Sequence, residues 1–502
     1  MLLAEVVLAS SAVAATSART AKVEALAALL RGAGPANAAI VVPWLSGELR
    51  QRRTGLGWAA LRELPPPAQD PTLTVAEVDA AFQTIAALGG PGSAGERRRL
   101  VHELFSRATA HEQALLRGLV SGELRQGALE GVMTDAIARA TGVPLNDVRR
   151  AAMLCGATAP VAVAALADGQ AGLAGFGLQV GRPIQPMLAS TAASIGDAFD
   201  RVEEAAVEWK LDGIRVQLHR DGDDVAVFSR SLDDITARVP ELVTAVRQLP
   251  LRSALLDGEA IALRPDGRPR PFQETGARVA TRAPREPVPL SLFLFDLLHL
   301  DGRDTIDLPA MERHDLMNGV VPDPLRAPRI VTASATEAGA FFDATVARGH
   351  EGVVVKSLAA PYEAGRRGAG WLKVKPVHTL DLVVLAVEWG HGRRRGWLSN
   401  LHLGARDPAS GEFVMLGKTF KGLTDELLRW QTEKLLTLET SRNDWQVFVR
   451  PELVVEVAFD GVQTSPRYPG GVALRFARVV RYREDKRPGE ADTIGTVRAF
   501  LA

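Results

Sequence analysis

The most informative stretch of the chain is EWKLDGIR, Glu208–Arg215. It places Lys210 at the end of an apolar strand pattern, just before an Asp-Gly turn, and Arg215 five residues later. A lysine amine is a poor nucleophile at its ordinary pKa of ~10.4, so it attacks only where neighbouring charges or burial lower that pKa. Arg215 could supply such a charge and could also neutralise a phosphate. By itself the string is more common in a solvent-exposed hairpin, so its meaning depends on the other motifs of the chain.

Further charged motifs occur in order along the chain. They are Phe228–Arg230 (FSR), Asp257–Glu259 (DGE), Phe293–Leu298 (FLFDLL), Glu351–Lys356 (EGVVVK) and Trp371–Pro376 (WLKVKP). Near the C-terminus, Leu474–Pro488 (LRFARVVRYREDKRP) holds five arginines and one lysine against two acidic residues. Clustered cations with paired carboxylates are what metal-assisted phosphoryl or nucleotidyl transfer needs, because positioning and charge neutralisation provide most of that catalysis.

The length of 502 residues predicts about three domains. Residues 1–182 show helical spacing and end at the proline-rich Gly181–Ala189, which disfavours helix. Residues 183–377 are predicted to form short strands with Asp-Gly turns, beginning with Val207–His219, which contains the turn Asp212-Gly213. Residues 378–502 are predicted to form several strands with a single helix, Thr424–Leu438, capped by Thr424. Such a strand-rich segment with one helix suits an OB-fold barrel.

A short internal repeat lies in the helical segment. SGELRQ at Ser46–Gln51 returns at Ser121–Gln126, and in each copy a glycine precedes a Glu-Leu-Arg stretch. The repeat predicts a pseudo-symmetric helical domain that presents two similar basic corners.

Composition restricts how a partner is held. Lys and Arg number 59, and so do Asp and Glu, which argues against binding of nucleic acid by overall charge but allows local patches such as Leu474–Pro488, with a net charge of +4. The single cysteine, Cys155, excludes a disulfide framework and a multi-cysteine zinc site. No apolar run approaches the ~20 residues of a membrane span. Met1–Ala15 lacks the basic start of a signal peptide, so a cytoplasmic protein is expected.

Taken together, KLDGIR, SRS, LDGE, FDLL, EGVVVK and WLKVKP, in this order, resemble the core of the covalent nucleotidyltransferases, and specifically of the ATP-dependent DNA ligases. LRFARVVRYREDK resembles their C-terminal motif, and the surroundings of SGELRQGALEG resemble the DNA-binding domain of the eukaryotic replicative ligase. The resemblance implies a multidomain fold: an all-α DNA-binding domain over residues 1–182, an α+β adenylation domain with antiparallel sheets over 183–377, and a β-barrel OB-fold over 378–502.

The resemblance also implies the reaction and its partners. AMP would pass from ATP to Lys210 with release of pyrophosphate, and then to the 5′-phosphate of a nick in double-stranded DNA. The 3′-hydroxyl would finally displace AMP and seal the strand. The protein would act as a monomer that encircles the DNA.

Roles in nucleotide binding are implied by the same resemblance. Glu208 would contact the adenine amino group, and Phe295 would stack on the base. Arg215 and Glu259 would hold the ribose and a nearby phosphate, and Arg230 would meet a phosphate. Three further cations would hold the α-phosphate: Arg367, Lys373 and Lys375.

The remaining roles concern the metal, the leaving group and the DNA. Glu351, with Glu259 as a second candidate, would bind Mg²⁺, for which Mn²⁺ could substitute. Phe272 and Phe476 would press against the sugars that flank a nick. Five residues of the C-terminal motif would orient the pyrophosphate: Arg475, Arg478, Arg481, Asp485 and Lys486.

Other functions stay open at this point. An RNA ligase or an mRNA-capping enzyme shares the superfamily core, although capping enzymes lack the helical domain. An NAD-dependent ligase is disfavoured because its zinc-binding cysteines are absent. A non-catalytic nick-binding clamp would not need a lysine nucleophile.

Overall fold

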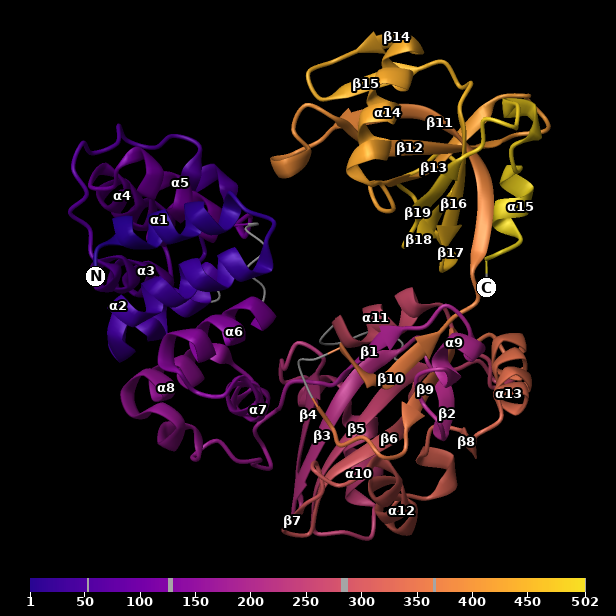
Figure 1. Cartoon of the computed structure of the whole chain (residues 1–502), viewed down its shortest axis with the longest axis horizontal. Helices are drawn as coiled ribbons and strands as arrows, with labels where there is room; N and C mark the ends of the chain where they lie inside the picture. The colour runs from indigo at the N-terminus through magenta and orange to yellow at the C-terminus, as the bar shows by residue number, and fades with distance from the viewer. Residues whose placement is uncertain (52–53, 125–129, 281–287, 364–366, 502) are drawn as a thin grey trace.

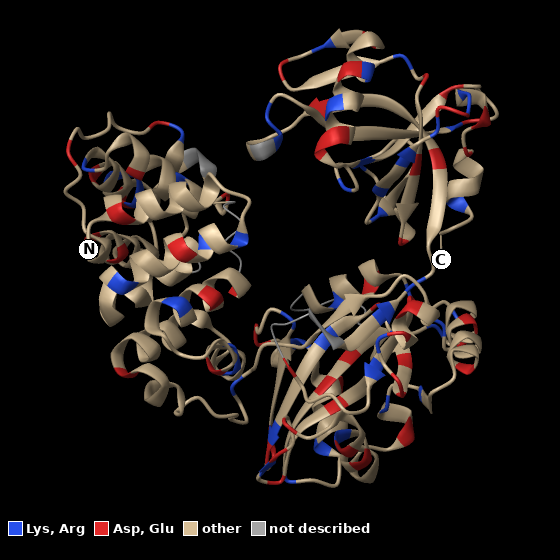
Figure 2. Cartoon of the chain, viewed as in Figure 1, with Lys and Arg blue, Asp and Glu red and all other residues tan. Residues whose placement is uncertain are grey.

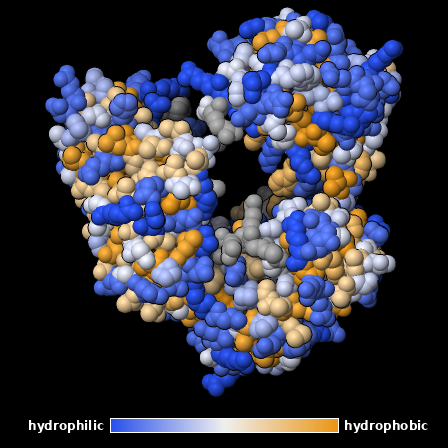
Figure 3. Space-filling model, viewed as in Figure 1, coloured by the Kyte–Doolittle hydropathy of each residue, from blue (hydrophilic) through white to orange (hydrophobic). Residues whose placement is uncertain are grey.

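The computed structural model describes residues 1–51, 54–124, 130–280, 288–363 and 367–501 (Figure 1). An N-terminal helical region, a central region of two sheets with covering helices, and a C-terminal β-rich region lie around a central opening (Figures 1 and 3). The predicted fold class is therefore confirmed. Acidic and basic side chains are interspersed over all three regions, in keeping with the zero net charge (Figure 2).

The helical region is built from amphipathic helices whose starts are readable in the sequence. Thr74 and Thr109 each accept a hydrogen bond from the N–H of a glutamate three residues later, Glu77 at 3.2 Å and Glu112 at 3.4 Å, and each glutamate accepts from the threonine N–H in return. Its α-helices are α1 (Leu3–Ala14), α2 (Arg19–Leu45), α3 (Val75–Ala87), α4 (Ser93–Ser106), α5 (Ala110–Ser121), α6 (Glu130–Thr141), α7 (Leu145–Cys155) and α8 (Thr158–Leu173), with a 3₁₀ turn, η1 (Trp58–Leu61).

Helix α2 corrects the expectation that no apolar stretch reaches the length of a membrane span. Of the helices in the described ranges, it alone is long and apolar enough by that test. Gly34 has a non-helical conformation inside α2, with φ +65°, so two helical segments meet there at a kink. Leu26, Leu30 and Val41 on α2 are fully or almost fully buried in the helical core, so this face is used for packing within the region.

The two copies of SGELRQ lie close together. Gly47 and Gly122 both have a positive φ, and Gly47 lies against the carbonyl of Leu124. In the first copy Arg50 forms an ion pair with Asp79 at 2.8 Å. Residues 125 and 126 of the second copy lie outside the described ranges, so the two basic corners remain a prediction.

Two five-stranded sheets form the central region. One has the order β1-β10-β9-β2-β8 and the other β4-β3-β5-β6-β7, and the pairing is antiparallel except between β1 and β10. The strands are β1 (Leu188–Thr191), β2 (Ala205–Lys210), β3 (Ile214–Asp221), β4 (Asp224–Ser229), β5 (Ser253–Ala262), β6 (Leu290–Leu300), β7 (Arg303–Asp304), β8 (Arg329–Thr332), β9 (Gly352–Ser357) and β10 (Arg367–Val374).

The predicted strand segment Val207–His219 is interrupted at the expected Asp212-Gly213 turn. Leu211–Gly213 separate two strands, β2 and β3, which belong to different sheets, and this change of sheet was not predicted. The Asp-Gly pair acts as the turn that lets the chain change sheets. Helices and 3₁₀ turns cover these sheets: α9 (Ile195–Phe199), η2 (Thr236–Arg238), α10 (Pro240–Arg247), α11 (Phe272–Ala280), α12 (Ala310–Val320), η3 (Asp323–Leu325) and α13 (Ala335–Ala347).

The C-terminal region has the strands and the single long helix that its sequence predicts. Helix α14 (Asp425–Thr437) begins after Thr424, whose hydroxyl accepts from the N–H of Leu427 at 3.2 Å. Strand β11 pairs with β12 along one edge and with β16 and β15 along the other, around a core of leucine and valine. The other elements are β11 (His378–Trp389), η4 (Gly392–Arg394), β12 (Leu398–Arg406), β13 (Phe413–Thr419), β14 (Glu439–Arg442), β15 (Gln446–Val449), β16 (Val454–Phe459), β17 (Gly461–Thr464), β18 (Val472–Arg475), β19 (Arg478–Tyr482), η5 (Pro488–Glu490) and α15 (Ile494–Arg498).

Candidate active site

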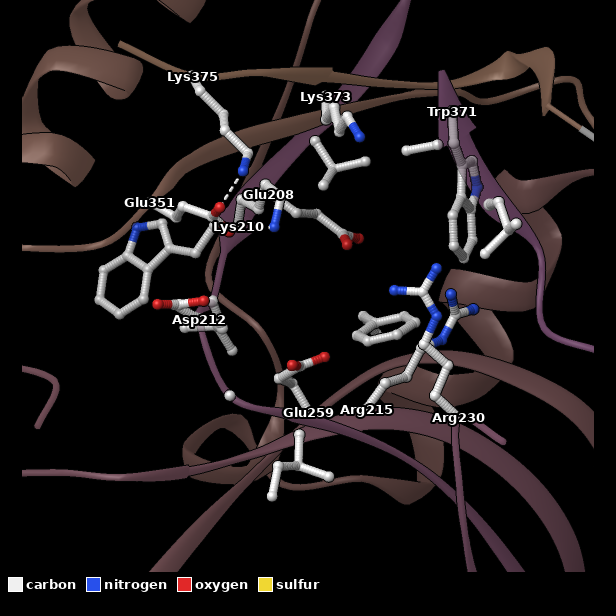
Figure 4. Close-up of a pocket in the computed structure, with 18 of the residues that line it drawn as sticks. Glu208, Lys210, Asp212, Arg215, Arg230, Glu259, Glu351, Trp371, Lys373 and Lys375 are labelled. Carbon is white, nitrogen blue, oxygen red and sulfur yellow. Dashed lines mark hydrogen bonds and ion pairs between the residues drawn. The ribbon is translucent and has the colours of Figure 1, made fainter. Parts of the chain in front are cut away.

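Motifs that lie far apart in the sequence converge on one cavity of about 550 Å³ between the two central sheets and the β17–β18 hairpin. Charged and aromatic side chains point into it from both sheets (Figure 4). The predicted site residues that line it are Glu208, Lys210, Arg215, Arg230, Glu259, Phe272, Phe295, Glu351, Lys373, Lys375, Arg475 and Phe476.

Lys210 is the last residue of β2, directly before the turn into β3. The turn depends on Gly213, because a Cβ there would lie 2.4 Å from the carbonyl oxygen of Ala260 on β5. This close approach brings the start of β3 against β5, so that Lys210 and Glu259 both face the cavity (Figure 4).

One carboxylate lies between two lysines. Glu351 accepts a hydrogen bond from the Lys210 amine and another from the Lys375 amine. Lys375 also contacts Asp460 of the C-terminal region at 2.9 Å. Burial opposes the charge of Lys375, but Glu351 outweighs it and raises the pKa of that amine. Lys373 lines the same cavity, as the shared strand face predicts.

Arg215 is held by a carboxylate that the sequence analysis did not single out. Its Nε and Nη2 atoms donate to the two oxygens of Asp257 at 3.0 and 2.6 Å, a bidentate pair. Burial works against the charge, yet Asp257 raises the pKa of Arg215 further above its ordinary value. The guanidinium carbon lies 5.5 Å from the centre of the Phe295 ring and 5.4 Å from that of Trp371.

Glu259 differs from the other carboxylates of the cavity. Burial raises its pKa to about 8, and the nearby cations Lys210 and Arg215 compensate only in part. A carboxyl with that pKa is mostly protonated at neutral pH. A cation placed beside it would favour the ionised form.

The opposite end of the cavity suits a planar base. Lys356 donates to one oxygen of Glu208 at 2.5 Å, while the other oxygen, Oε1, is buried and has no hydrogen-bond partner among the described residues. Burial lowers the pKa of Lys356 in spite of the attraction of Glu208. The Lys356 amine also lies 4.5 Å from the centre of Phe295 and 4.4 Å from that of Trp371. The other contacts of Oε1 are with Nε of Arg329 at 3.4 Å and Nε2 of His314 at 3.7 Å, so the buried Glu208 carboxylate lies among basic side chains beside the aromatic surface.

The hairpin of the C-terminal region completes the cavity. Arg475 forms an ion pair with Asp212 of the KLDGIR motif at 2.5 Å and lies 5.5 Å from the ring of Phe272. Phe476 has φ +54°, a left-handed conformation that a phenylalanine rarely adopts, and its side chain is 56% exposed. Strain of this kind persists where the surroundings impose it, often at functional sites.

The rest of the C-terminal motif lies elsewhere. Arg478 contacts Asp460 at 3.5 Å, Arg481 contacts Glu456 at 2.7 Å, and Lys486 contacts Asp381 at 2.6 Å. Asp485 pairs with Arg483. These four predicted pyrophosphate ligands do not line the cavity in this conformation. The side chain of Arg367 lies outside the described part of the chain.

The structure adds residues that the motifs did not identify as parts of the site. Asp257 precedes Glu259 in the DGE motif, and Lys356 ends EGVVVK, so both were visible in the sequence but without an assigned partner. Asp460 and Tyr362 lie in segments with no motif, and only the folded chain brings them to Lys375 and Arg215.

Comparisons with known proteins match this chain to DNA ligases along its whole length. The family models described as "DNA ligase N terminus", "ATP dependent DNA ligase domain" and "ATP dependent DNA ligase C terminal region" match residues 62–138, 186–375 and 394–486. Proteins named "Probable DNA ligase" from Beutenbergia cavernae and Nocardioides sp. are 61% and 60% identical, over 100% of this chain and 99% of each relative. A solved structure titled "Pmar-Lig_Pre." has the same fold, with a TM-score of 0.64 at 17% identity over 95% of this chain and 99% of that one.

Proposed function

The chain belongs to the ATP-dependent DNA ligases, as its motifs predicted, and from that membership we propose that it seals nicks in duplex DNA through a covalent AMP on Lys210. A nick here means a 5′-phosphate beside a 3′-hydroxyl. The observation that carries the proposal is the Lys210 amine hydrogen-bonded to Glu351 in a cavity that also holds further cations and an aromatic wall.

In the first transfer the Lys210 nitrogen attacks the α-phosphorus of ATP. A P–N bond forms, the bond from the α-phosphorus to the bridging oxygen breaks, and pyrophosphate leaves. The amine must give up a proton, and Glu351 is the carboxylate in contact with it. Lys373, Lys375 and Arg367 stabilise the charge that develops on the α-phosphate.

The base end of the cavity supports ATP over GTP. The exocyclic amino group of adenine is a donor, and the carboxylate of Glu208, which lines the cavity, is an acceptor. Guanine presents a carbonyl oxygen at the same position, which the carboxylate would repel. Phe295 stacks on the base, while Arg215, Arg230 and Glu259 hold the ribose and a phosphate.

The residues present fit a divalent cation. Mg²⁺ prefers oxygen ligands and is commonly held by one or two carboxylates together with substrate phosphates. Glu351 and Glu259 face the same cavity as the lysines, and no set of three His, Cys, Asp or Glu side chains converges anywhere in the described ranges. That pattern supports a cation shared with ATP, either Mg²⁺ or Mn²⁺. Such an ion supplies charge neutralisation at the phosphates.

Nicked duplex DNA fits the opening that the three regions surround (Figure 3). Phe272 and Phe476 are 40% and 56% exposed at the mouth of the cavity, where they can press against the sugars beside a nick. We place a monomer around the DNA, with residues 1–182 as the DNA-binding domain, 183–377 as the adenylation domain and 378–502 as the OB-fold. Its location is the cytoplasm.

The pyrophosphate role of the C-terminal motif requires a different orientation of the OB-fold. Arg475 already lines the cavity. For Arg478, Arg481, Asp485 and Lys486 to reach ATP, the OB-fold must rotate about the linker that follows β10. We propose that it does so for lysine adenylation and returns to the present orientation for sealing.

Labelled nucleotides test the proposal. The protein is incubated with Mg²⁺ and with ATP, GTP or NAD labelled in the AMP or GMP part, and the label on the protein is measured. Label from ATP alone, lost in Lys210→Ala, is expected. Label from GTP would indicate a capping enzyme, and no label from any of the three would indicate a non-catalytic clamp. Sealing of nicked DNA compared with nicked RNA then separates a DNA ligase from an RNA ligase.

A further inference from the structure

Tyr362 lies behind the cavity and belongs to none of the motifs. It is 2% exposed, in the segment between β9 and β10, and its ring packs edge-on against Trp371 with the ring centres 5.7 Å apart. Its backbone N–H donates to the carbonyl of Ile306 at 3.0 Å. The ring is therefore fixed in place directly beside a wall of the nucleotide cavity.

The Tyr362 hydroxyl uses its whole hydrogen-bonding capacity in one network. It donates to Oδ2 of Asp257 at 2.7 Å. It accepts from the N–H of Met187 at 3.0 Å and from Nη2 of Arg215 at 3.2 Å. A hydroxyl has one donor and two acceptor positions, and all three are occupied. Burial and the neighbouring Asp257 raise the pKa of Tyr362, so the hydroxyl keeps its proton.

The same network determines which way the Arg215 guanidinium faces. Four of its five N–H groups have partners in the described chain: two on the Asp257 carboxylate, one on Tyr362, and one, from Nη1, on the carbonyl of Met187 at 2.5 Å. The fifth N–H, also on Nη1, is left for a ligand in the cavity that Arg215 lines. Asp257 alone would not prevent a tilt of the guanidinium, because both of its bonds lie on one edge.

We propose that Tyr362 is a positioning residue for ATP, which acts by holding the Arg215 guanidinium in the orientation that contacts the nucleotide. The proposal rests on the proposed function of the cavity. The Tyr362 network also contacts the segment that connects the helical region to the central region. Met187 of that segment lies directly before Leu188 and Ala189, which line the cavity. Tyr362 and Arg215 together bind both polar groups of the Met187 backbone.

The test measures ATP affinity by calorimetry in a Lys210→Ala background, where no covalent step occurs. Tyr362→Phe keeps the ring and removes the hydroxyl, and we expect ATP to bind about tenfold more weakly, ~1.4 kcal/mol. The control is Thr345→Val, which also removes one buried hydroxyl. The Thr345 hydroxyl donates one hydrogen bond to the carbonyl of Phe341 at 2.7 Å, within α13 and away from the residues that line the cavity. We expect it to lower thermal stability to a similar extent and to leave ATP affinity unchanged.

A double-mutant cycle separates positioning from a general loss of structure. In an Arg215→Lys background, Tyr362→Phe should cause no further loss of affinity, because the group that it positions is gone. Asp257→Asn provides a second variant that weakens the same network from the other side, and its effect should not add to that of Tyr362→Phe. Unchanged affinity in Tyr362→Phe, or the same loss in the Arg215→Lys background, overturns the inference.

The two hypotheses fail in different ways. A wild-type protein that binds ATP with the expected dependence on Tyr362, but forms no lysine–AMP, contradicts the proposed function and leaves the positioning role in place. A wild-type protein that forms lysine–AMP while Tyr362→Phe binds ATP normally contradicts only the positioning role.

Discussion

The central region contacts the helical region on one side and the C-terminal OB-fold on the other, and these two interfaces, called here the first and the second joint, are built from different interactions. At the first joint, Met153 and Leu154 of α7 share one apolar cluster with residues of the central region, among them Leu255 and Trp371. At the second joint, no apolar cluster of described residues includes members from both the central region and the OB-fold. One joint is a continuous core, and the other is a polar contact.

The first joint is also held by the connecting segment. The N–H of Gly181 donates to Nδ1 of His219 at 2.9 Å. The backbone of Ile184 forms two hydrogen bonds with the Gln217 side chain, at 2.8 and 3.1 Å. Arg150 of α7 adds an ion pair with Asp307. These contacts fix the helical region to the strands that carry the nucleotide site.

The second joint consists of partly exposed polar pairs. They are Arg475 with Asp212, Lys375 with Asp460, and Gln273 with Thr464, the last with two hydrogen bonds at 3.3 Å. Ion pairs of this kind typically contribute ~0.2–1 kcal/mol each and weaken with salt. The joint to the C-terminal region therefore has the weaker contacts of the two, which is in keeping with the rotation of the OB-fold proposed above.

The largest expected effect comes from the apolar joint. Leu154 is 2% exposed, and Leu154→Ala should lower the free energy of unfolding by about 3 kcal/mol, because it removes buried contacts and leaves a cavity. Denaturant unfolding measures this. Thr464→Val at the polar joint is the comparison and should change stability by less than about 0.5 kcal/mol. Equal effects at the two joints would remove the contrast between them.

The next prediction concerns two of the four assigned residues of the C-terminal motif that lie away from the cavity. Arg481→Ala combined with Lys486→Ala should slow lysine adenylation about 100-fold, as loss of charge stabilisation does, and leave sealing of a pre-adenylated nick within about twofold. Arg442→Ala is the control, since Arg442 is an exposed arginine of the same region that pairs with Glu439. If both steps fell together, rotation of the OB-fold would not be needed to explain the motif.

The connecting segment should make the first joint sensitive to acid. Burial lowers the pKa of His219 to about 4 from 6.5, with His299 adding to the shift, so the folded protein keeps this imidazole neutral. As pH falls, His219 is protonated in the unfolded chain before it is protonated in the folded protein. The contribution of His219 to stability is therefore present above pH 6.5 and is lost as pH falls toward 4. Inside that window the free energy of unfolding should fall by about 1.4 kcal/mol per pH unit.

His219→Asn tests this prediction by chemical denaturation at several pH values. The asparagine oxygen can accept from Gly181 but does not titrate, so the pH dependence should be flatter than that of the wild type. An identical slope in the variant would exclude His219 as the source.

The smallest expected effect is at the polar joint. Arg475→Ala removes the ion pair with Asp212, and it should reduce nick sealing about fivefold, ~1 kcal/mol, since the pair is partly exposed. Because Arg475 pairs with Asp212 in the orientation that we propose for sealing, lysine adenylation should change less than sealing does, in contrast to the pyrophosphate role that the family resemblance implies for Arg475. Single-turnover assays of the two steps measure both rates. A larger loss in adenylation than in sealing would assign Arg475 to the first step instead.

The sequence predicted the residues that line the cavity better than it predicted the strands and helices that hold them in place. Lys210, Glu351 and Lys375 could be identified because each stands at a strand end within a motif of fixed charge pattern. The turn at Asp212-Gly213 was predicted, but the change of sheet there was not, because a local turn signal does not say which strand the next one pairs with. Helix α12 was not predicted; it begins after Pro309 without a side-chain cap, so the usual start signal is absent.

Long-range partners could not be predicted from a single sequence. Tyr362 has no motif around it, and Asp460 lies in an ordinary turn; the fold alone brings Tyr362 to Arg215 and Asp460 to Lys375. The orientation of the OB-fold is likewise not encoded in local pattern. It depends on a few polar pairs whose partners are more than 80 residues apart, the nearest being Lys375 and Asp460.

Peptide mass spectrometry locates the residue that carries AMP. After incubation with ATP and Mg²⁺, we expect one adenylated peptide, with AMP on Lys210, and none when GTP replaces ATP. AMP on another lysine such as Lys373, or no adenylated peptide at all, would contradict this expectation.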